Sequence, residues 1–351
     1  MTETIRLATR ASDLALRQAT SVATALESRR RDVELVEVET TGDQLRDELI
    51  HRLGKTGAFV RSLDEKVLEG NVDAAVHSMK DVPTEFPDEL IVAGVPERAS
   101  ARDVLVTPEG DTLDALENGA TVGTSSLRRK AQLLAERPDL DVRPLRGNVD
   151  TRVQKLLAPS LQEEHQRRLD AGENEGYEVS VDEWFDGLAE VERQALGRDI
   201  ETTFDAIVLA EAGLSRLDLL RDVEYERLSN EFVPASGQGA LAITALDGEL
   251  AETLRSVLDH PRSRVETTVE RTILETLGGG CVAPLGIYAV LQGAFVHVTV
   301  RVLSRDGTEE IAASRDLPVE HHPEAAHEFA TELADDGAAE LIQRARKELG
   351  E

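Results

Sequence analysis

The first two-thirds of the chain alternate short apolar segments with helical patterns, and no other feature constrains the fold as strongly. The apolar segments are rich in Val, Ile and Leu and are bounded by turn residues, which predicts strands. Between them apolar residues recur at helical spacing, as in the helix expected after Ser12. Strands that alternate with helices are typical of parallel α/β sheets. The predicted strands are 5–9, 33–38, 72–78, 90–95, 103–107, 120–124, 141–145, 204–210 and 240–246.

The last roughly ninety residues have a different pattern. An amphipathic helix is predicted over 265–277, with Gly278 as its C-terminal stop. Three alternating segments then predict an antiparallel meander, which a final helix follows. The segments are 286–292, 294–304 and 309–318, and the helix covers about 323–349. We therefore expect a small α+β domain at the C-terminus.

The composition excludes several classes of function. Acidic residues number 68 against 39 Lys and Arg, and the net charge of −29 repels nucleic acid and anionic membranes. No apolar run is long enough to span a membrane, and the N-terminus lacks an apolar signal region, so we expect a cytoplasmic protein. Only six of the basic residues are lysine, and an acidic, lysine-poor surface favours a halophilic source over an ordinary acidic enzyme.

Basic residues recur where the predicted strands end. In open parallel sheets, ligands bind beyond the carboxyl ends of the strands. Any one arginine there is more simply a solvated residue or a helix cap. Several at one edge predict an anion site, because the planar guanidinium binds carboxylate and phosphate in a bidentate manner. The implied ligand is a polyanion that contacts both α/β domains. The basic residues concerned are Arg10, Lys80, Arg128, Arg129, Arg146, Arg152 and Arg216, and the hydroxyl residues Ser12 and Ser126 follow two of the same strands.

Asp81 is the acid among these loops. From SMKDVP alone it is more simply a turn aspartate before a Val-Pro pair. Alternatively, its carboxylate is held ionised beside Lys80 and stabilises a cationic intermediate or transfers protons. His77 is expected to be a packed or hydrogen-bonded strand residue without a catalytic role. The segment GQGAL, which contains Gln238, is by itself a tight turn and matches neither common phosphate-binding loop.

Cys281 is the only cysteine in the chain and directly follows three glycines. One cysteine excludes a disulfide framework and a cysteine-based metal site, and no metal is predicted. A lone cysteine is more often a small buried residue than a nucleophile, and the preceding helix C-terminus disfavours thiolate. Three glycines, however, favour the close approach of a backbone or a bulky group. A permanent covalent attachment therefore suits this thiol better than rapid turnover.

Taken in order, these segments resemble the porphobilinogen deaminase family. The matching stretches are RLATRASDLAL, GAFVRSLDEKVLEGNVDAAVHSMKDVPTEFP, VGTSSLRRKAQL, LRGNVDTR, DAIVLAEAGLSRL, PASGQGAL and GGGCVAPLG. They cover nearly the whole chain outside 158–203, a polar segment that contains Trp184, the only tryptophan. We expect this segment to be an exposed, partly helical, acidic insertion without a counterpart in typical members.

The resemblance implies a transferase of tetrapyrrole and heme biosynthesis. In the family the loop cysteine, here Cys281, forms a thioether to a dipyrromethane cofactor made from two substrate units, which serves as primer. Four porphobilinogen molecules are added head to tail with loss of ammonia, and water releases the linear tetrapyrrole hydroxymethylbilane. The catalytic aspartate of the family corresponds to Asp81, which would donate and accept protons, assist formation of the azafulvene electrophile and stabilise positive charge on the pyrrole nitrogen. Each pyrrole carries an acetate and a propionate, so the growing chain is a polyanion.

The resemblance also assigns binding roles. The residues that correspond to cofactor-binding positions are Cys281, Ser12, Lys80, Asp81, Thr124, Ser126, Arg128, Arg129, Arg146 and Gln238. Those that correspond to substrate-binding positions are Arg10, Ser12, Phe59, Arg146, Arg152 and Arg216. The chain departs from the family where GKTGAF replaces the common GGKGLF, so that Thr56 takes the usual lysine place and Lys55 is shifted by one. It departs again at Val282 and Ala283, where a polar residue and a valine are usual.

The implied fold is two doubly wound α/β domains like a type II periplasmic binding protein, followed by a C-terminal α+β domain. Hinge-like segments at 98–103 and 233–238 make the first domain discontinuous. The expected domains are 1–100 with 236–258, 101–235 with the insertion, and 259–351. Two other interpretations stay open, a solute-binding module of the same architecture and a structural or regulatory protein whose insertion recruits a partner. The family suggests a monomer whose partner is the small-molecule substrate porphobilinogen.

Overall fold

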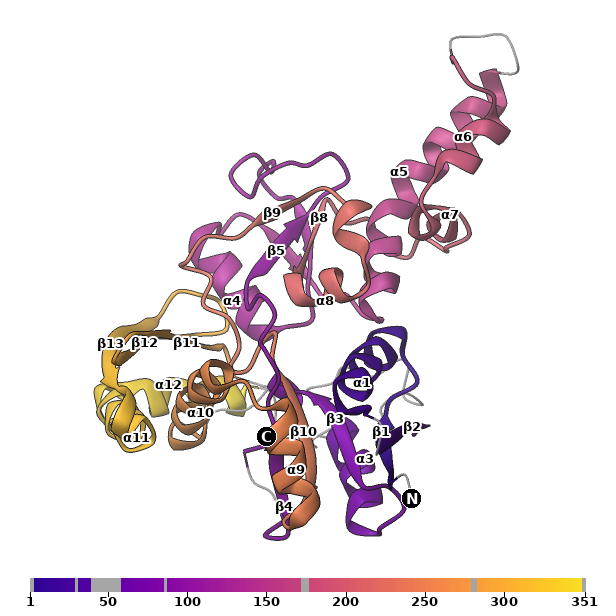
Figure 1. The fold of residues 1–351 in the computed structure, drawn as a ribbon. Coiled ribbons are helices and arrows are strands. Elements are labelled where there is room, and N and C mark those ends of the chain that lie inside the picture. Colours follow the sequence, from indigo (N-terminus) through magenta and orange to yellow (C-terminus); the bar gives the residue numbers. More distant parts are fainter. Residues whose placement is uncertain are drawn as a thin grey trace.

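The structure, a computed structural model, describes residues 3–28, 31–38, 58–84, 87–171, 177–278 and 283–348. It contains two five-stranded sheets and one three-stranded sheet. Figure 1 shows three lobes, with the two α/β lobes one above the other and the C-terminal lobe beside them. None of the helices described is both long and apolar enough to cross a membrane.

The first α/β lobe is built on a sheet with the strand order β2-β1-β3-β10-β4. Leu7 of β1 packs with helices α1 and α9, and the next residue, Ala8, packs with α3, so that helices cover both faces. The elements are β1 (Glu3–Thr9), α1 (Asp13–Leu26), β2 (Arg31–Glu37), α3 (Ala58–Leu68), β3 (Ala74–Ser78), the 3₁₀ turn η2 (Met79–Asp81), β4 (Leu90–Gly94), β10 (Leu241–Leu246) and α9 (Glu249–Leu258).

The second α/β lobe repeats this arrangement in a sheet with the order β7-β6-β8-β5-β9. Val104 of β5 packs with α5, whereas Leu105 packs with α4 on the opposite face. Strand β9 is not among the predicted strands and is only three residues long. The elements are β5 (Asp103–Val106), β6 (Thr121–Gly123), α4 (Leu127–Glu136), β7 (Asp141–Arg143), α5 (Val149–Ala171), β8 (Ala206–Ala210), α8 (Glu211–Arg216) and β9 (Tyr225–Arg227).

The predicted fold class is confirmed, but the two sheets are mixed rather than parallel. Strand β10 pairs antiparallel with β3, and β5 pairs antiparallel with β8. Each follows a crossing of the chain between the lobes, the first crossing (95–102) before β5 and the second crossing (228–240) before β10. Leu241 lies opposite Ser78, the last residue of β3, and Asp103 lies opposite Ala210, the last residue of β8. A strand that enters a sheet at the carboxyl edge of its neighbours must run against them. Alternation along the chain predicts the strands but not the edge at which the chain enters.

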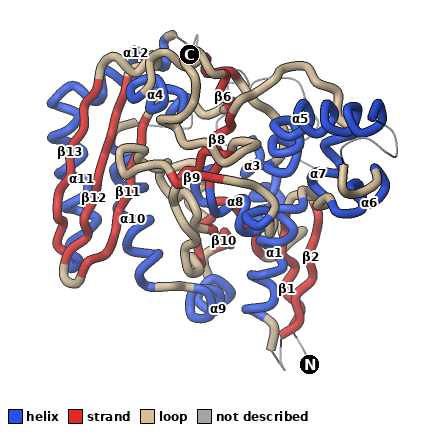
Figure 2. Tube along the Cα trace, turned by 90° about the horizontal axis from the view of Figure 1, so that it is seen from above, coloured by secondary structure: helices blue, strands red, loops and turns tan. Residues whose placement is uncertain are grey.

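The C-terminal lobe is α+β, as predicted. Three strands form an antiparallel meander, and helices α10 and α11 pack on one of its faces (Figure 2). The elements are α10 (Pro261–Thr276), β11 (Leu285–Gln292), β12 (Phe295–Leu303), β13 (Glu310–Pro318), α11 (His322–Leu333) and α12 (Ala339–Lys347). Gly278 follows α10 with a left-handed φ of 63°, as expected for a helix stop.

The prediction of a single final helix over about 323–349 is wrong. A wider turn over Ala334–Ala338 separates α11 from α12, and within it Gly337 has a φ of 104°. A residue with this φ cannot continue a right-handed helix. The apolar periodicity continues across the break because both helices bury their apolar faces against the same sheet.

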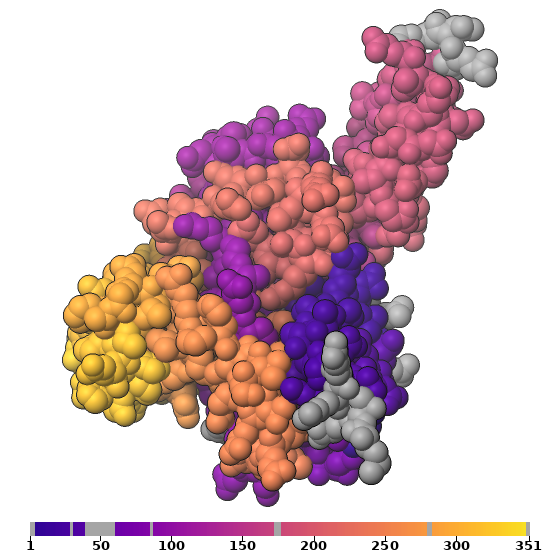
Figure 3. All heavy atoms as spheres, viewed as in Figure 1, coloured from indigo at the N-terminus to yellow at the C-terminus, as the bar shows by residue number. Residues whose placement is uncertain are grey.

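An arm formed by the second half of α5, by α6 (Val181–Gly187) and by α7 (Glu190–Leu196) projects from the second lobe (Figures 1 and 3). It contains most of the predicted insertion, which is partly helical as expected. The two ends of the predicted insertion nevertheless belong to the second lobe. Helix α5 continues through the predicted start of the insertion, and Ala158, Val191 and Ala195 are buried in the core of the lobe. In the sequence these apolar residues lie among charged ones, so composition alone places the two boundaries of the insertion too far apart.

The C-terminal lobe is fastened to both crossings by Glu270. This side chain of α10 is fully buried and forms an ion pair with Arg98 of the first crossing at 2.8 Å. It also accepts hydrogen bonds from the backbone N–H of Gly237 in the second crossing (2.6 Å) and of Ala289 in β11 (2.8 Å). One carboxylate therefore connects the segments that link all three lobes.

Gly307, in the turn between β12 and β13, packs against α4 of the second lobe. Its φ is 76°, and a Cβ atom there would lie 2.6 Å from the carbonyl oxygen of Ala131. We predict that Gly307→Ala lowers the free energy of unfolding by about 2 kcal/mol, measured by denaturant unfolding. Gly293→Ala is the matched control, because Gly293 has a φ of 65° but an added Cβ meets no described atom within 4 Å. Equal losses in both variants would contradict a role for the contact with α4.

Candidate active site

The carboxyl ends of the parallel strands lie at the crossings between the two α/β lobes. The backbone N–H of Met79, directly after β3, donates to the carbonyl of Ala240 at 3.0 Å. The N–H of Glu211, directly after β8, donates to the carbonyl of Arg102 at 3.0 Å. The loops that carry most of the predicted site residues therefore converge on one region, as expected for open α/β sheets.

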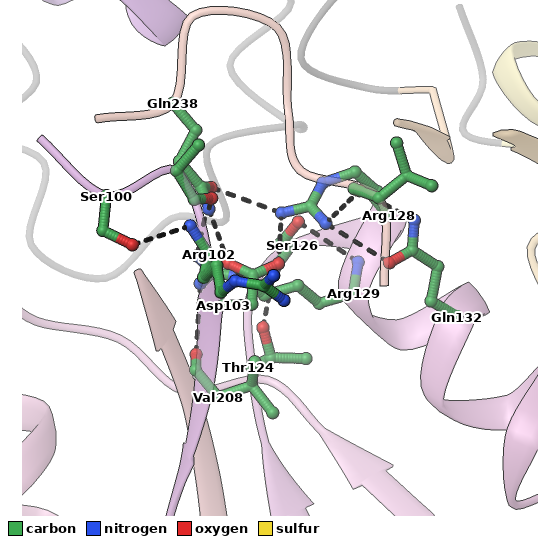
Figure 4. A network of polar contacts seen from close by, with 12 residues as sticks. Ser100, Arg102, Asp103, Thr124, Ser126, Arg128, Arg129, Gln132, Val208 and Gln238 are labelled. Atoms are coloured by element: carbon green, nitrogen blue, oxygen red, sulfur yellow. Dashed lines mark hydrogen bonds and ion pairs between the residues drawn. The ribbon is translucent and has the colours of Figure 1, made fainter. Parts of the chain in front are cut away.

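Asp103 is the centre of a buried network in this region (Figure 4). Its carboxylate is fully buried and forms ion pairs with Arg128 and Arg129, both at 2.8 Å. Gln238 donates from Nε2 to this carboxylate at 2.8 Å and accepts at Oε1 from both guanidinium groups. Asp103 begins β5, the arginines lie in the first turn of α4 and Gln238 lies in the second crossing, so the network joins three distant segments.

The charges of this network stabilise one another. Burial alone would raise the pKa of Asp103, but Arg128, Arg129 and a hydrogen bond from Gln238 lower that pKa to about 2. Burial lowers the pKa of Arg128, and Asp103 partly offsets this effect. The two arginines are therefore buried and held by a carboxylate, rather than projecting freely from the end of a strand.

Asp103 is not among the predicted site residues, because the strand-end pattern concerns residues that follow strands, whereas Asp103 begins one. The signal that could have found it is its position as the last residue of the hinge-like segment 98–103. A strand that starts at a crossing places its first residue at the site edge of the sheet. Gln238 reaches the same edge in the same way, from the turn before β10.

Lys80 and Asp81 lie in η2, at the end of β3 in the first lobe. Lys80 is half-buried and Asp81 is exposed. Burial lowers the pKa of Lys80, Asp81 and Asp103 raise it, and Arg129 and Arg152 lower it further. Residues of both lobes thus act on one ammonium group, so Lys80 lies near the arginines of the second lobe.

Arg152, in the first turns of α5, extends the positive region. Its Nε donates to the carbonyl of Gly147 at 2.8 Å. Burial and the charges of Arg129 and Arg146 lower the pKa of Arg152 to about 10. Because the protonated forms of Lys80 and Arg152 are disfavoured where they stand, a neighbouring anion would stabilise both, and the region favours an anionic ligand.

Arg216, the last residue of α8, belongs to the same region. Its guanidinium donates to the carbonyl of Gly239 at 2.7 Å, directly after Gln238. Burial lowers the pKa of Arg216. The second crossing therefore contacts cations of α4 and of α8, and it holds both helices at the site.

The segment TSSLRR forms the N-terminus of α4. Ser126 caps α4 by accepting from the backbone N–H of Arg129 at 3.4 Å, and Thr124 is buried beside it. Ser12 caps α1 in the same way, accepting from the N–H of Ala15 at 3.4 Å. Each serine hydroxyl oxygen thus accepts one backbone hydrogen bond from its helix. A ligand would bind through the O–H donor and the second lone pair that remain.

Three further predicted site residues remain, of which two lie partly or wholly outside the described structure. Arg10 directly follows β1 and is half-buried. Phe59 lies in the first turn of α3, and its side chain is outside the described part of the structure. Cys281 lies outside the described residues, as do Lys55 and Thr56 of the departing loop.

His77 is buried in β3 and hydrogen-bonded, as predicted. Its Nε2 lies 2.8 Å from Oδ1 of Asp64 and 3.1 Å from the hydroxyl of Thr244. Asp64 belongs to α3 and Thr244 to β10, so the histidine fastens this helix to the first sheet.

Comparisons with known proteins cover all three lobes. The family model described as "Porphobilinogen deaminase, dipyromethane cofactor binding domain" matches residues 5–164 and 192–252, and that described as "Porphobilinogen deaminase, C-terminal domain" matches 265–339. The first model leaves residues 165–191 unmatched, a segment of the arm that is shorter than the predicted insertion.

Curated relatives match over almost their whole length. A probable porphobilinogen deaminase of Halobacterium salinarum is 50% identical over 98% of both chains. A probable porphobilinogen deaminase of Methanococcoides burtonii is 40% identical over 97% of this chain and 96% of its own. The porphobilinogen deaminase of Campylobacter fetus is 38% identical over 98% of this chain and 99% of its own. The chain therefore belongs to the porphobilinogen deaminase family, whose members are transferases with a dipyrromethane cofactor.

Proposed function

We propose that this chain is a hydroxymethylbilane synthase. It adds four porphobilinogen molecules head to tail, with loss of one ammonia for each, onto a dipyrromethane primer bound through Cys281. Water then releases the linear tetrapyrrole hydroxymethylbilane. The observation that carries this proposal is a cationic region built from both α/β lobes, in which Lys80, the neighbour of Asp81, lies near the arginines of the second lobe. Each pyrrole of the substrate bears an acetate and a propionate, for which such a region provides the counter-charges.

The residues present fit a dipyrromethane. Its acetate and propionate groups need cations, which Lys80, Arg128 and Arg129 can supply. Two buried polar atoms, Nε of Arg128 and the hydroxyl oxygen of Ser236, have no hydrogen-bond partner among the described residues. Because an unpaired buried polar atom destabilises a protein, a bound polar ligand would offset that cost.

Binding roles follow from this fit together with the family membership. We propose that the cofactor contacts Ser12, Lys80, Asp81, Thr124, Ser126, Arg128, Arg129, Arg146 and Gln238. We propose that the substrate contacts Arg10, Ser12, Phe59, Arg146, Arg152 and Arg216. Ser12 and Arg146 stand in both sets, since each added unit extends the bound chain within one site.

Helix α10, which precedes the cysteine loop, supports attachment of the cofactor at Cys281. Arg271 of this helix donates to the carbonyl of Val82 at 3.0 Å and to that of Pro83 at 2.7 Å. These two residues directly follow Asp81. The helix that leads to the cysteine is therefore bonded to the loop of the proposed catalytic acid.

Strand β11, which follows the cysteine loop, supports the same assignment. The N–H of Ile287 donates to the carbonyl of Pro234 at 2.8 Å. The neighbouring carbonyl of Val233 accepts a hydrogen bond from Arg128 at 2.8 Å. The chain after the cysteine is thus held beside the arginine network, and the chain before it beside Asp81.

Asp81 is the proposed proton donor and acceptor. Its carboxylate is exposed at the end of η2, beside Lys80, where it can reach a ligand held by the cations. Once it is protonated, the amino group of porphobilinogen leaves as ammonia. The electron pair of the ring nitrogen then stabilises the electron-poor carbon from which the ammonia has departed. A carboxylate beside that nitrogen stabilises the positive charge and can later accept a proton. When bound, the dipyrromethane supplies the pyrrole carbon to which the first unit is added.

We propose the domain division expected from the sequence, 1–100 with 236–258, 101–235, and 259–351. The strands that follow the crossings support it, because β5 joins the second sheet and β10 returns to the first. We also propose a cytoplasmic monomer that binds neither nucleic acid nor membranes. The net charge of −29 supports this, and with the scarcity of lysine it supports an acidic surface suited to concentrated salt.

Intact mass spectrometry tests the attachment. After incubation with porphobilinogen in concentrated salt, the protein is expected to exceed its sequence mass by two porphobilinogen units less two ammonias. Cys281→Ser should keep its sequence mass, and circular dichroism checks that this variant is folded. A wild-type protein that gains no mass would contradict the proposal and favour the solute-binding module.

A further inference from the structure

We propose that Arg17 and Asp218 form a latch between the two α/β lobes and act as positioning residues for the candidate active site. Arg17 lies in α1 of the first lobe, and Asp218 lies just after α8 of the second. Nη1 of Arg17 lies 2.5 Å from Oδ2 of Asp218 and 3.4 Å from the carbonyl oxygen of Arg216. The inference rests on the proposed function, because it concerns the site at which that function is carried out.

The latch joins two helices that carry proposed binding residues. Ser12 caps α1, less than two turns before Arg17. Arg216 ends α8, and its side chain reaches the second crossing beside Gln238. A change in the separation of α1 and α8 therefore moves Ser12 relative to Arg216.

Asp218 has an unusual backbone for its residue type. Among the residues that the structure describes, it is the only one other than glycine with a positive φ, 60°. Aspartate adopts this conformation more readily than most residues, but glycine does so without strain. The conformation of the turn therefore does not by itself explain why residue 218 is an aspartate. The ion pair that its carboxylate forms with the other lobe explains this choice.

The ion pair acts on the arrangement of the lobes rather than on folding. The exposed fractions of the side chains are 51% for Arg17 and 79% for Asp218. Such a pair contributes little to the stability of a domain and is weakened by salt. Between two lobes joined by two crossings, however, a contact of this strength changes the ratio of closed to open arrangements by about twofold to fivefold.

A double-mutant cycle on the cofactor-loaded enzyme tests the latch. Arg17→Gln and Asp218→Asn each remove one charge, and asparagine retains the preference for the left-handed backbone. At the lowest salt concentration at which the protein stays folded, each single variant should raise the KM for porphobilinogen about twofold to fivefold. The double variant should differ from the wild type by no more than either single variant. These differences should shrink in molar salt, where the screening length falls to about 3 Å.

Two further variants test whether the change in KM comes from the Asp218 carboxylate and from its place between the lobes. Asp218→Gly keeps the backbone and lacks the carboxylate, so it should match Asp218→Asn. Arg344→Gln should keep the wild-type KM, because Arg344 and Glu309 form a similarly exposed ion pair at 2.7 Å within the C-terminal lobe. A wild-type KM in Asp218→Gly, or a raised KM in Arg344→Gln, would overturn the latch.

Small-angle X-ray scattering gives a readout that does not depend on activity. Arg17→Gln and Asp218→Asn should have a larger radius of gyration than the wild type, and Arg344→Gln should not. Additive effects of the two charge removals on KM, or an unchanged radius of gyration, would also count against the latch. Either result leaves the proposed function intact as long as the wild type consumes porphobilinogen. A wild type without turnover would contradict the proposed function instead.

Discussion

Asp81→Asn is expected to lower the turnover of porphobilinogen by at least about 100-fold while the fold is retained. Asparagine has the shape of aspartate but cannot accept a proton or place a negative charge beside the pyrrole nitrogen. Asp81 is exposed, so the substitution should cost little free energy of unfolding. The rate of porphobilinogen consumption measures the loss, and circular dichroism checks the fold.

The control for Asp81→Asn is Asp88→Asn, which removes another exposed carboxylate from the connection between β3 and β4. It should retain wild-type rates. The mass of each variant should be measured first, so that a slow rate reflects turnover and not a missing cofactor. A cofactor-loaded Asp81→Asn variant with near-normal rates would show that the proposed proton transfer is wrong.

Asp103→Asn is expected to lower the free energy of unfolding by about 3–5 kcal/mol. The substitution leaves two buried guanidinium groups, those of Arg128 and Arg129, facing a neutral amide. The loss of one partner from a buried ion pair is costly because the remaining charges stay out of water. Denaturant unfolding at neutral pH measures the difference, which should be accompanied by weaker loading of the cofactor.

The effect of Asp103 should also depend on pH. The pKa of Asp103 is about 2 in the folded protein, below the value of about 3.9 for an unfolded chain. A lowered pKa adds stability that is fully present above the unfolded value and is lost as the pH falls through the folded one. The difference between wild type and Asp103→Asn should therefore narrow as the pH falls from about 4 to about 2.

Asp141→Asn is the matched control for Asp103→Asn. Asp141 also pairs with an arginine, Arg143, at 2.7 Å, but 45% of its side chain is exposed. Its replacement should therefore cost no more than about 1 kcal/mol. If Asp103→Asn cost as little, the buried network would not hold the arginines in the way proposed.

Local features of the chain determined much of the fold. Ser12 and Ser126 begin helices because their hydroxyls accept backbone N–H groups near them in sequence. Gly278 follows the end of α10 because glycine adopts a positive φ without strain. The predicted strands rest on apolar runs of a few residues, and the strand-end arginines and Asp81 follow them directly. These features depend on neighbours along the chain, so the sequence alone predicts them, and their order identifies the family.

The tertiary structure decided what depends on residues far apart in the chain. Asp103 and Gln238 are 135 residues apart and hydrogen-bonded, and the ion pair of Arg17 with Asp218 spans 201 residues. No local pattern indicates which carboxylate a buried guanidinium will contact. The direction of β5 and β10 is also decided at this level, because the crossings feed each strand into its sheet from the carboxyl edge. The sequence therefore determined which groups stand near the candidate site, and the packing of the lobes decided which of them are paired with one another and which are buried.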